Sequence, residues 1–282
     1  MERHITAGID GSSESVDAAD WAAREALRRG LPLHLVHAVD EPASRTRLPE
    51  LDAPAERERN ALDRTALRLS CRHPALNIRP SRVPGPPVPS LLAAAESAET
   101  LVLGSRGYTG FAAFMVGSVA LRVTAGASRP VVLVRAGERP EDEHEDSASG
   151  PYSPVVLGLD LDHACDEVLE YAFDAAALRR APLHVVHTWM VPLVPSASAD
   201  DPEEEKARAL TAALAPWRRK YPDVPVREQL FHGRAGHHLL LASTKASLMV
   251  IGRRITPGGH LGTTTHSVVH HVLCPVAVVP HA

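Results

Sequence analysis

An internal repeat constrains this 282-residue sequence more than any other feature. The segment HITAGIDGS (4–12) corresponds to PVVLGLDLD (154–162), and LRRGLPLHLVHAV corresponds to LRRAPLHVVHTWM. A duplicated chain folds into two similar domains whose core segments are kept while their loops drift in length. We therefore predict a domain at residues 1–136 and a second at 153–282. The acidic segment between them, 137–152, is typical of a solvated linker.

Each copy alternates apolar segments with amphipathic ones. ITAGID, LHLVHAV, TLVLG and PVVLV have the composition of strands that are covered on both faces of a parallel sheet. Residues 13–29 form a helical pattern, for which we expect Ser12 as the N-cap and Gly30 as the stop. Its predicted buried face contains Val16, Ala19, Ala23 and Leu27. Residues 54–72 predict an amphipathic helix, and 77–83 predict an edge strand.

This alternation predicts the α/β class, with two tandem Rossmann-like doubly wound domains. Each domain is expected to contain a five-stranded parallel sheet in the order 3-2-1-4-5, with helices on both faces. The last segments of the copies, RPVVLV and CPVAVV, then become apolar edge strands that need a cover.

Composition excludes several functional classes. The net charge of −4 gives no electrostatic footprint for nucleic acid. No apolar run approaches the roughly 20 residues that a membrane span needs. Three dispersed cysteines form neither a metal spacing nor a disulfide framework, and MERHITAGID has no signal-like apolar stretch. We expect a cytoplasmic protein with no nucleic-acid or membrane partner.

The candidate ligand site lies where the strand order reverses. Asp10 closes the first strand of the first copy and Gly104 closes the fourth, so both are expected at one crevice. A helix beginning near Ser118 would direct free N–H groups and its positive dipole end toward a phosphate. The alternatives are that these glycines serve loop geometry alone and that Asp10 is a helix-capping carboxylate.

Asp10 followed by Gly104-x-x-Gly107, nine residues and Gly117-Ser118 resembles the ATP-binding pattern of the universal stress protein family. The tandem copies resemble its two-domain members. The resemblance implies ATP, alone or with Mg, as the ligand. It implies that Asp10 contacts the ribose, that the main chain at Ala38 meets the adenine and that Gly8 lines the crevice. The phosphates would be held by Gly104, Gly107, Gly117, Ser118 and the Val119 amide, beside Arg106, the one charged residue of 104–118.

The second copy departs from this pattern. It keeps Asp160, Gly252, Gly262 and Thr263, but Ile255 replaces the second glycine, and Asp162 adds a negative charge near the crevice. A β-branched residue disfavours positive φ and projects a Cβ toward the phosphates. We expect this site to be weak or empty.

The pattern predicts binding rather than catalysis. Phosphoryl-transfer sites usually place a Lys or Arg on the transferred group and a carboxylate on the metal. The first 150 residues contain no lysine, and 104–118 contain no acidic residue. We expect a regulator of the stress response without catalytic residues, and at most slow ATP hydrolysis. A nucleotide-free scaffold is the main alternative, and an ATP-dependent ligase or adenylyl transferase is a further one.

Two expectations concern histidines and assembly. His34, His37, His184 and His187 lie in predicted core strands, where satisfaction by neighbouring groups is favoured over catalysis. The i, i+4 pair His266 and His270 has no obvious third ligand, so no metal site is expected.

The family resemblance implies that the last strands of the two domains pair antiparallel within the chain. A homodimer and an unknown protein partner stay open.

Overall fold

The computed structural model describes residues 3–39, 49–105, 116–145, 150–163, 165–190 and 202–282. The chain divides into two compact units, one built mainly from residues before 140 and the other mainly from those after. Each unit alternates parallel strands with helices, which confirms the predicted α/β class.

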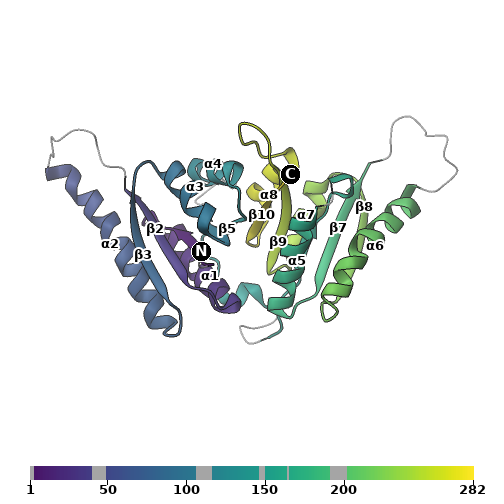
Figure 1. Cartoon of the computed structure of the whole chain (residues 1–282), viewed down its shortest axis with the longest axis horizontal. Helices are drawn as coiled ribbons and strands as arrows, with labels where there is room; N and C mark the ends of the chain where they lie inside the picture. Colours follow the sequence, from purple (N-terminus) through teal and green to yellow (C-terminus); the bar gives the residue numbers. More distant parts are fainter. Residues whose placement is uncertain (1–2, 40–48, 106–115, 146–149, 164, 191–201) are drawn as a thin grey trace. The chain divides into compact units, whose positions relative to one another are not determined.

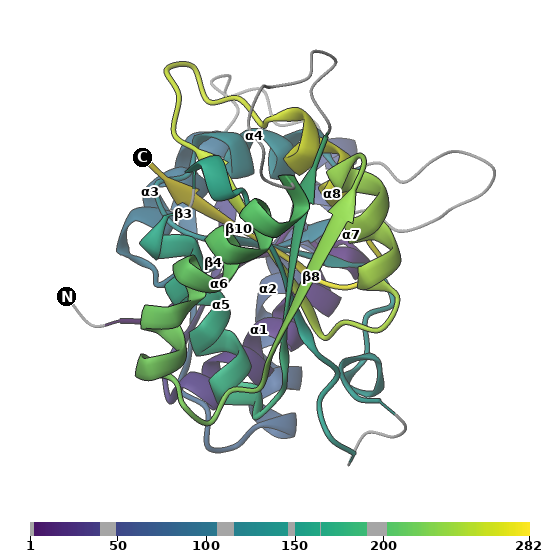
Figure 2. The ribbon, with the colours of Figure 1, turned by 90° about the vertical axis from the view of Figure 1, so that its right-hand side faces the viewer.

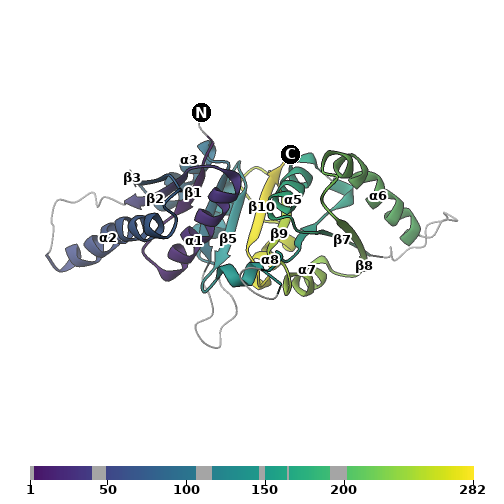
Figure 3. The same cartoon turned by 90° about the horizontal axis from the view of Figure 1, so that it is seen from below.

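The first unit is a five-stranded parallel sheet covered on both faces. Its strand pairs give the order β3-β2-β1-β4-β5. Helices α1 and α2 lie on one face of this sheet, and α3 and α4 lie on the other (Figures 1 and 3). The elements are β1 (Ile5–Gly8), α1 (Ser13–Arg29), β2 (Leu33–Val39), α2 (Pro49–Arg72), β3 (Ile78–Pro84), α3 (Pro87–Ser97), β4 (Thr100–Ser105), α4 (Ser118–Gly126) and β5 (Val131–Arg135).

The second unit repeats this arrangement with the order β8-β7-β6-β9-β10. Figure 2 shows α5 and α6 on one face of its sheet and α7 and α8 on the other. Its elements are η1 (Pro140–Glu143), β6 (Val155–Gly158), η2 (Leu161–His163), α5 (Asp166–Arg179), β7 (Leu183–Trp189), α6 (Pro202–Lys220), β8 (Val226–His232), α7 (Ala235–Ser243), β9 (Leu248–Arg254), α8 (Thr263–His271) and β10 (Val276–His281). The pairing of the two last strands with each other stays a prediction.

The ends of α1 are set by local sequence signals. The Ser12 side chain accepts a hydrogen bond from the Ser15 N–H at 3.2 Å, and Gly30 ends the helix in the left-handed region at φ 63°. Both predicted termini are therefore confirmed. The corresponding stop of α5 is Arg180, at φ 50°, a conformation that costs a residue with a Cβ more than it costs glycine.

The predicted buried face of α1 is only partly correct. Ala19 and Ala23 are fully buried, but Leu27 is 41% exposed, and Glu25, which lies outside the predicted buried face, is completely buried. The helix packs against β1, β4 and β5 and also touches α2, so it is covered over more than one face. The single-stripe pattern of a surface helix therefore does not apply. The predicted edge strand is confirmed, since β3 pairs only with β2 among the described strands of its unit.

The segment between the copies is more structured than a solvated linker. Glu143 is buried, and its carbonyl accepts a hydrogen bond from the Ser153 N–H at 2.9 Å. His144 and Tyr152 form an antiparallel bridge, with ring centroids 4.2 Å apart. Apart from Glu143, its described residues are exposed or half-buried, so the segment is a partly ordered hairpin and its role as a linker stays a prediction.

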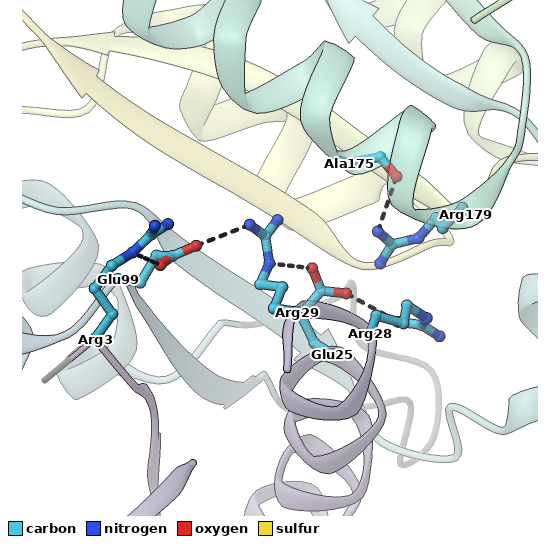
Figure 4. A network of polar contacts seen from close by, with 7 residues as sticks. All are labelled: Arg3, Glu25, Arg28, Arg29, Glu99, Ala175 and Arg179. Atoms are coloured by element: carbon cyan, nitrogen blue, oxygen red, sulfur yellow. Dashed lines mark hydrogen bonds and ion pairs between the residues drawn. The ribbon is translucent and has the colours of Figure 1, made fainter. Parts of the chain in front are cut away.

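A buried carboxylate organises a polar network at the C-terminal end of α1 (Figure 4). Glu25 accepts hydrogen bonds from Arg28 at 2.9 Å and from Arg29 at 2.7 Å, and its side chain is fully buried. Arg29 also bonds Glu99 at 2.9 Å, and Glu99 in turn pairs with Arg3 at 2.6 Å. In the second unit Arg179 stands at the position of Arg29, but its guanidinium donates to a main-chain carbonyl of α5 at 3.3 Å.

We predict that Glu25→Gln destabilises the protein by about 3 kcal/mol, because removing one partner of a buried ion pair leaves uncompensated charge. The control is Asp63→Asn, which breaks the exposed Asp63–Arg82 pair and should cost about 0.5 kcal/mol. The free energy of unfolding from urea titration tests both. Equal losses in the two variants would contradict the assigned role of burial.

Candidate functional site

Three of the predicted site residues, Asp10, Ala38 and Gly104, lie at the carboxyl ends of β1, β2 and β4. β1 lies between β2 and β4, and its last ladder bond runs from the Ile9 N–H to the Val36 carbonyl at 2.8 Å. Asp10 follows directly. The register that pairs Ala7 with Val102 places Gly104 beside the end of β1. Asp10 and Gly104 therefore lie at the same edge of the sheet, where open α/β sheets bind ligands.

Asp10 is held by the start of α1. Its Oδ1 accepts hydrogen bonds from the Ser12 N–H at 3.0 Å and the Ser12 hydroxyl at 2.5 Å. Burial alone would raise the pKa of Asp10, but hydrogen bonds from Ser12 and Ser15 outweigh it and bring this pKa below its ordinary value. The N-cap is Ser12, so Asp10 supports the cap rather than forming it. The site therefore presents an ionised carboxylate of fixed orientation.

Two of the predicted glycines have steric reasons inside the protein. A Cβ on Gly104 would lie 2.6 Å from the main-chain carbonyl of Glu14 and 2.8 Å from the Ser15 nitrogen, so only glycine admits the first turn of α1. A Cβ on Gly8, the last residue of β1, would lie 2.7 Å from the Leu103 side chain. The sequence pattern did not reveal this role in packing.

Gly117 differs from both. It is the N-cap of α4, with φ −59° and ψ 148°, values that any residue can adopt. A Cβ placed on it meets no atom of the described residues within 4 Å. Ser118 and Val119 follow in the exposed first turn, where a helix leaves its N–H groups without intrahelical acceptors and where anions commonly bind. Arg106 and Gly107 lie outside the described residues.

The strand β2 carries Ala38, the position at which the family resemblance implies the adenine. Ala38 is half-buried near the end of that strand and pairs with Val83 of β3. Its neighbour His37 is buried, and the ring Nδ1 lies 2.7 Å from the Ile9 carbonyl oxygen. His187 of the second unit makes the same contact with the Leu159 carbonyl at 2.9 Å. The expectation that neighbouring groups satisfy these histidines holds for the Nδ1 atoms of both, but the buried His187 Nε2 has no hydrogen-bond partner among the described residues. Their place at the site was missed.

The second unit has the same frame with a different carboxylate environment. Each carboxylate oxygen of Asp160 makes one polar contact at 3.1 Å. Oδ1 accepts a hydrogen bond from the Asp162 N–H, and Oδ2 contacts His163 Nδ1. A Cβ on Gly252 would meet the His281 ring at 3.0 Å. The helix start repeats that of the first unit, with a glycine N-cap in open space and an exposed first residue, Gly262 and Thr263.

Position 255 in the second unit gives no backbone strain. Ile255 is 55% exposed, and its N–H donates to the carbonyl of the terminal strand residue His281 at 2.7 Å. Its φ is not positive, because Arg180 is the one such non-glycine residue of the described chain. Among the described residues, no three His, Cys, Asp or Glu side chains come together in a way that could hold a metal ion.

Comparison with known proteins decides the family. The model of the universal stress protein family matches residues 1–135 and 151–280. The chain belongs to the universal stress protein family. Universal stress protein Rv2005c of Mycobacterium tuberculosis is 30% identical over 292 residues, which cover 97% of this chain and 96% of that protein. A homologue from Mycolicibacterium smegmatis is also 30% identical, over 99% of this chain and 97% of its own.

Solved universal stress proteins share the fold. The crystal structure of one from Archaeoglobus fulgidus DSM 4304 covers 99% of this chain and 98% of its own, with a TM-score of 0.75 at 18% identity. This similarity confirms the tandem α/β architecture. A universal stress protein solved in complex with cAMP covers 48% of this chain and 98% of its own, at 22% identity and a TM-score of 0.39.

Among the described helices, none is both long and apolar enough to cross a membrane.

Substitution at the two kinds of glycine should separate packing from ligand access. We predict that Gly104→Ala lowers the free energy of unfolding by about 2 kcal/mol, because its Cβ overlaps the Glu14 main chain. Gly117→Ser should leave that energy unchanged or raise it, since serine is a good N-cap and the position is open. Urea titration measures both. A Gly104→Ala variant as stable as wild type would contradict the close contact.

We predict that Asp10 stabilises the fold in a pH-dependent way. Because its folded pKa lies below the ordinary value of 3.8, its contribution is fully present well above that pH and is lost as pH falls through the folded pKa. The difference in unfolding free energy between wild type and Asp10→Asn should therefore shrink on acidification. In a Ser12→Ala background the pH dependence should be weaker. A difference that is constant with pH would disprove the linkage.

Proposed function

We propose that the first unit is an ATP-binding regulatory module that holds its nucleotide without efficient turnover. The observation that carries this proposal is the open space at Gly117. Packing against the described residues explains the missing side chains of Gly8 and Gly104, but not that of Gly117. A helix start kept clear in this way, in the same unit as an ionised Asp10, fits a ligand that has both phosphates and hydroxyls.

The fit of ATP to these residues can be followed from end to end. Asp10 would accept hydrogen bonds from the ribose hydroxyls, and the main chain at Ala38 would meet the adenine. The N–H groups of Gly117, Ser118 and Val119 would bind the phosphates, with any Mg²⁺ carried by the nucleotide itself. Arg106 and Gly107, outside the described residues, complete the sequence pattern. Family membership supports this assignment of the site.

The residue types favour holding the nucleotide over hydrolysing it. Efficient phosphoryl transfer requires positioned cations and a metal-binding carboxylate around the transferred group. Residues 104–118 contain one charged side chain and the first 150 residues contain no lysine. We therefore infer a regulator, acting in the cytoplasm, whose conformation or choice of partner follows its nucleotide state. Its turnover would lie below about 1 per second, near the lower end of ordinary enzymes.

A nucleotide-free scaffold is the second candidate, favoured by one observation. Gly104 belongs to the nucleotide pattern, yet the approach of α1 to β4 already demands a glycine there. A scaffold with this fold would therefore keep Gly104 without any ligand. It gives no reason for the open position at Gly117, which is why ATP binding is preferred.

Titration calorimetry with Mg-ATP tests the proposal. We predict one site per chain, because Asp160 of the second unit is already bonded on both oxygens. Gly117→Val should weaken binding at least tenfold, since its side chain enters the open space. The matched control Gly262→Val alters the equivalent position of the second unit and should leave the affinity unchanged. Negligible heats with wild type, together with no nucleotide in acid extracts, would favour the scaffold.

A further inference from the structure

The ladder between β1 and β2 stops in an unusual way. Its last pair is Gly8 with Val36, followed by the bond from the Ile9 N–H to the Val36 carbonyl. In a regular parallel ladder, the next bond would join the Ile9 carbonyl to the Ala38 N–H. Among the described residues, no backbone N–H donates to the Ile9 carbonyl. The side chain of His37 takes its place, with Nδ1 at 2.7 Å.

The direction of Ala38 follows from the bonds of its neighbour. The Val39 carbonyl accepts from the Gly85 N–H at 2.9 Å, so Val39 bonds on the β3 side. Successive residues of a parallel strand bond to opposite neighbours. The main-chain N–H and C=O of Ala38 therefore point to the β1 side, just beyond the last rung of the ladder. This is the sheet edge that carries Asp10.

In the second unit, the ladder between β6 and β7 ends in the same way. Its ladder ends with the Leu159 N–H donating to the Val186 carbonyl at 3.0 Å, and His187 Nδ1 takes the Leu159 carbonyl at 2.9 Å. Both histidine side chains are buried, at 6% and 4% exposure. A carbonyl oxygen only accepts, so each ring donates from a protonated Nδ1. Two copies that differ at many other positions keep this contact within 0.2 Å.

We propose that His37 is a positioning residue of the nucleotide site and sets its preference for adenine. By occupying the Ile9 carbonyl, it ends the ladder early and keeps the Ala38 N–H and C=O available for the base. It also fixes the peptide that leads into Asp10. A main-chain donor beside an acceptor matches the ring nitrogen and amino group of adenine. It opposes the N–H and carbonyl of guanine. This inference rests on the proposed function.

Paired substitutions test the role of the Nδ1 donor. His37→Leu removes it at similar shape and lets the Ala38 N–H bond the Ile9 carbonyl, so we expect ATP to bind at least tenfold more weakly and the ATP-to-GTP affinity ratio to fall toward one. Asn carries an N–H at the place of Nδ1, so His37→Asn should bind ATP within about threefold of wild type. Calorimetry with both nucleotides measures these effects.

His187→Leu is the matched control, since it removes the same buried contact from the second unit. It should lower thermal stability about as much as His37→Leu while leaving ATP affinity unchanged. A His37→Leu variant with the wild-type affinity and ATP-to-GTP ratio would overturn this inference and leave the proposed function standing. A wild-type chain that binds no adenine nucleotide would overturn both.

Amide hydrogen exchange on the wild-type chain decides the matter even where His37→Leu fails to fold. The Ala38 amide should exchange freely without nucleotide, because it lies beyond the ladder. Saturating ATP should slow its exchange at least tenfold, and GTP at the same concentration should not. Protection of the Ala38 amide in the nucleotide-free chain would show that the ladder continues, and the inference would then be wrong.

Discussion

The contact between the first turn of α1 and the main chain of β4 is the constraint on which the rest of the site depends. Glu14 and Ser15 approach β4 so closely at Gly104 that no side chain fits there. This approach brings the N-cap, Ser12, to the edge of the sheet. Ser12 donates two hydrogen bonds to Asp10, so the position of the helix start fixes the orientation of this carboxylate. The close packing at Gly104 in β4 thereby determines the orientation of the Asp10 carboxylate, which follows β1.

The two copies show how a duplicated site can diverge without a change of frame. Strand order, the glycine N-caps of α4 and α8 and the histidine contact at the end of the central ladder are kept. The change lies in a few side chains: Asp160 bonds Asp162 and His163, where Asp10 bonds only the N-cap region. Such contacts need few changes in sequence, and they engage two of the roughly four acceptor sites of the carboxylate.

Sequence patterns predicted the features that local forces decide, such as the caps of α1 and the alternation of strands and helices. They failed where tertiary packing decides, since Glu25 is buried and Leu27 exposed on a helix covered on more than one face. The sequence predicted a set of site residues, of which Asp10, Ala38 and Gly104 lie at one edge of the sheet. It did not distinguish Gly104, which packing requires, from Gly117, whose Cβ position meets no described atom. The histidine contact was also missed, because main-chain register is not visible in a residue pattern.

The hairpin between the copies bears on how the chain tolerates changes of length. The Glu143 carbonyl and the Ser153 N–H are bonded to each other, so the entry and exit of this excursion lie side by side. Residues added between them would enlarge a closed loop whose entropy cost grows only slowly with length. The span available to connect the halves would stay the same. Related chains can therefore differ in the length of this loop. A foreign peptide inserted there should leave the fold of each unit unchanged.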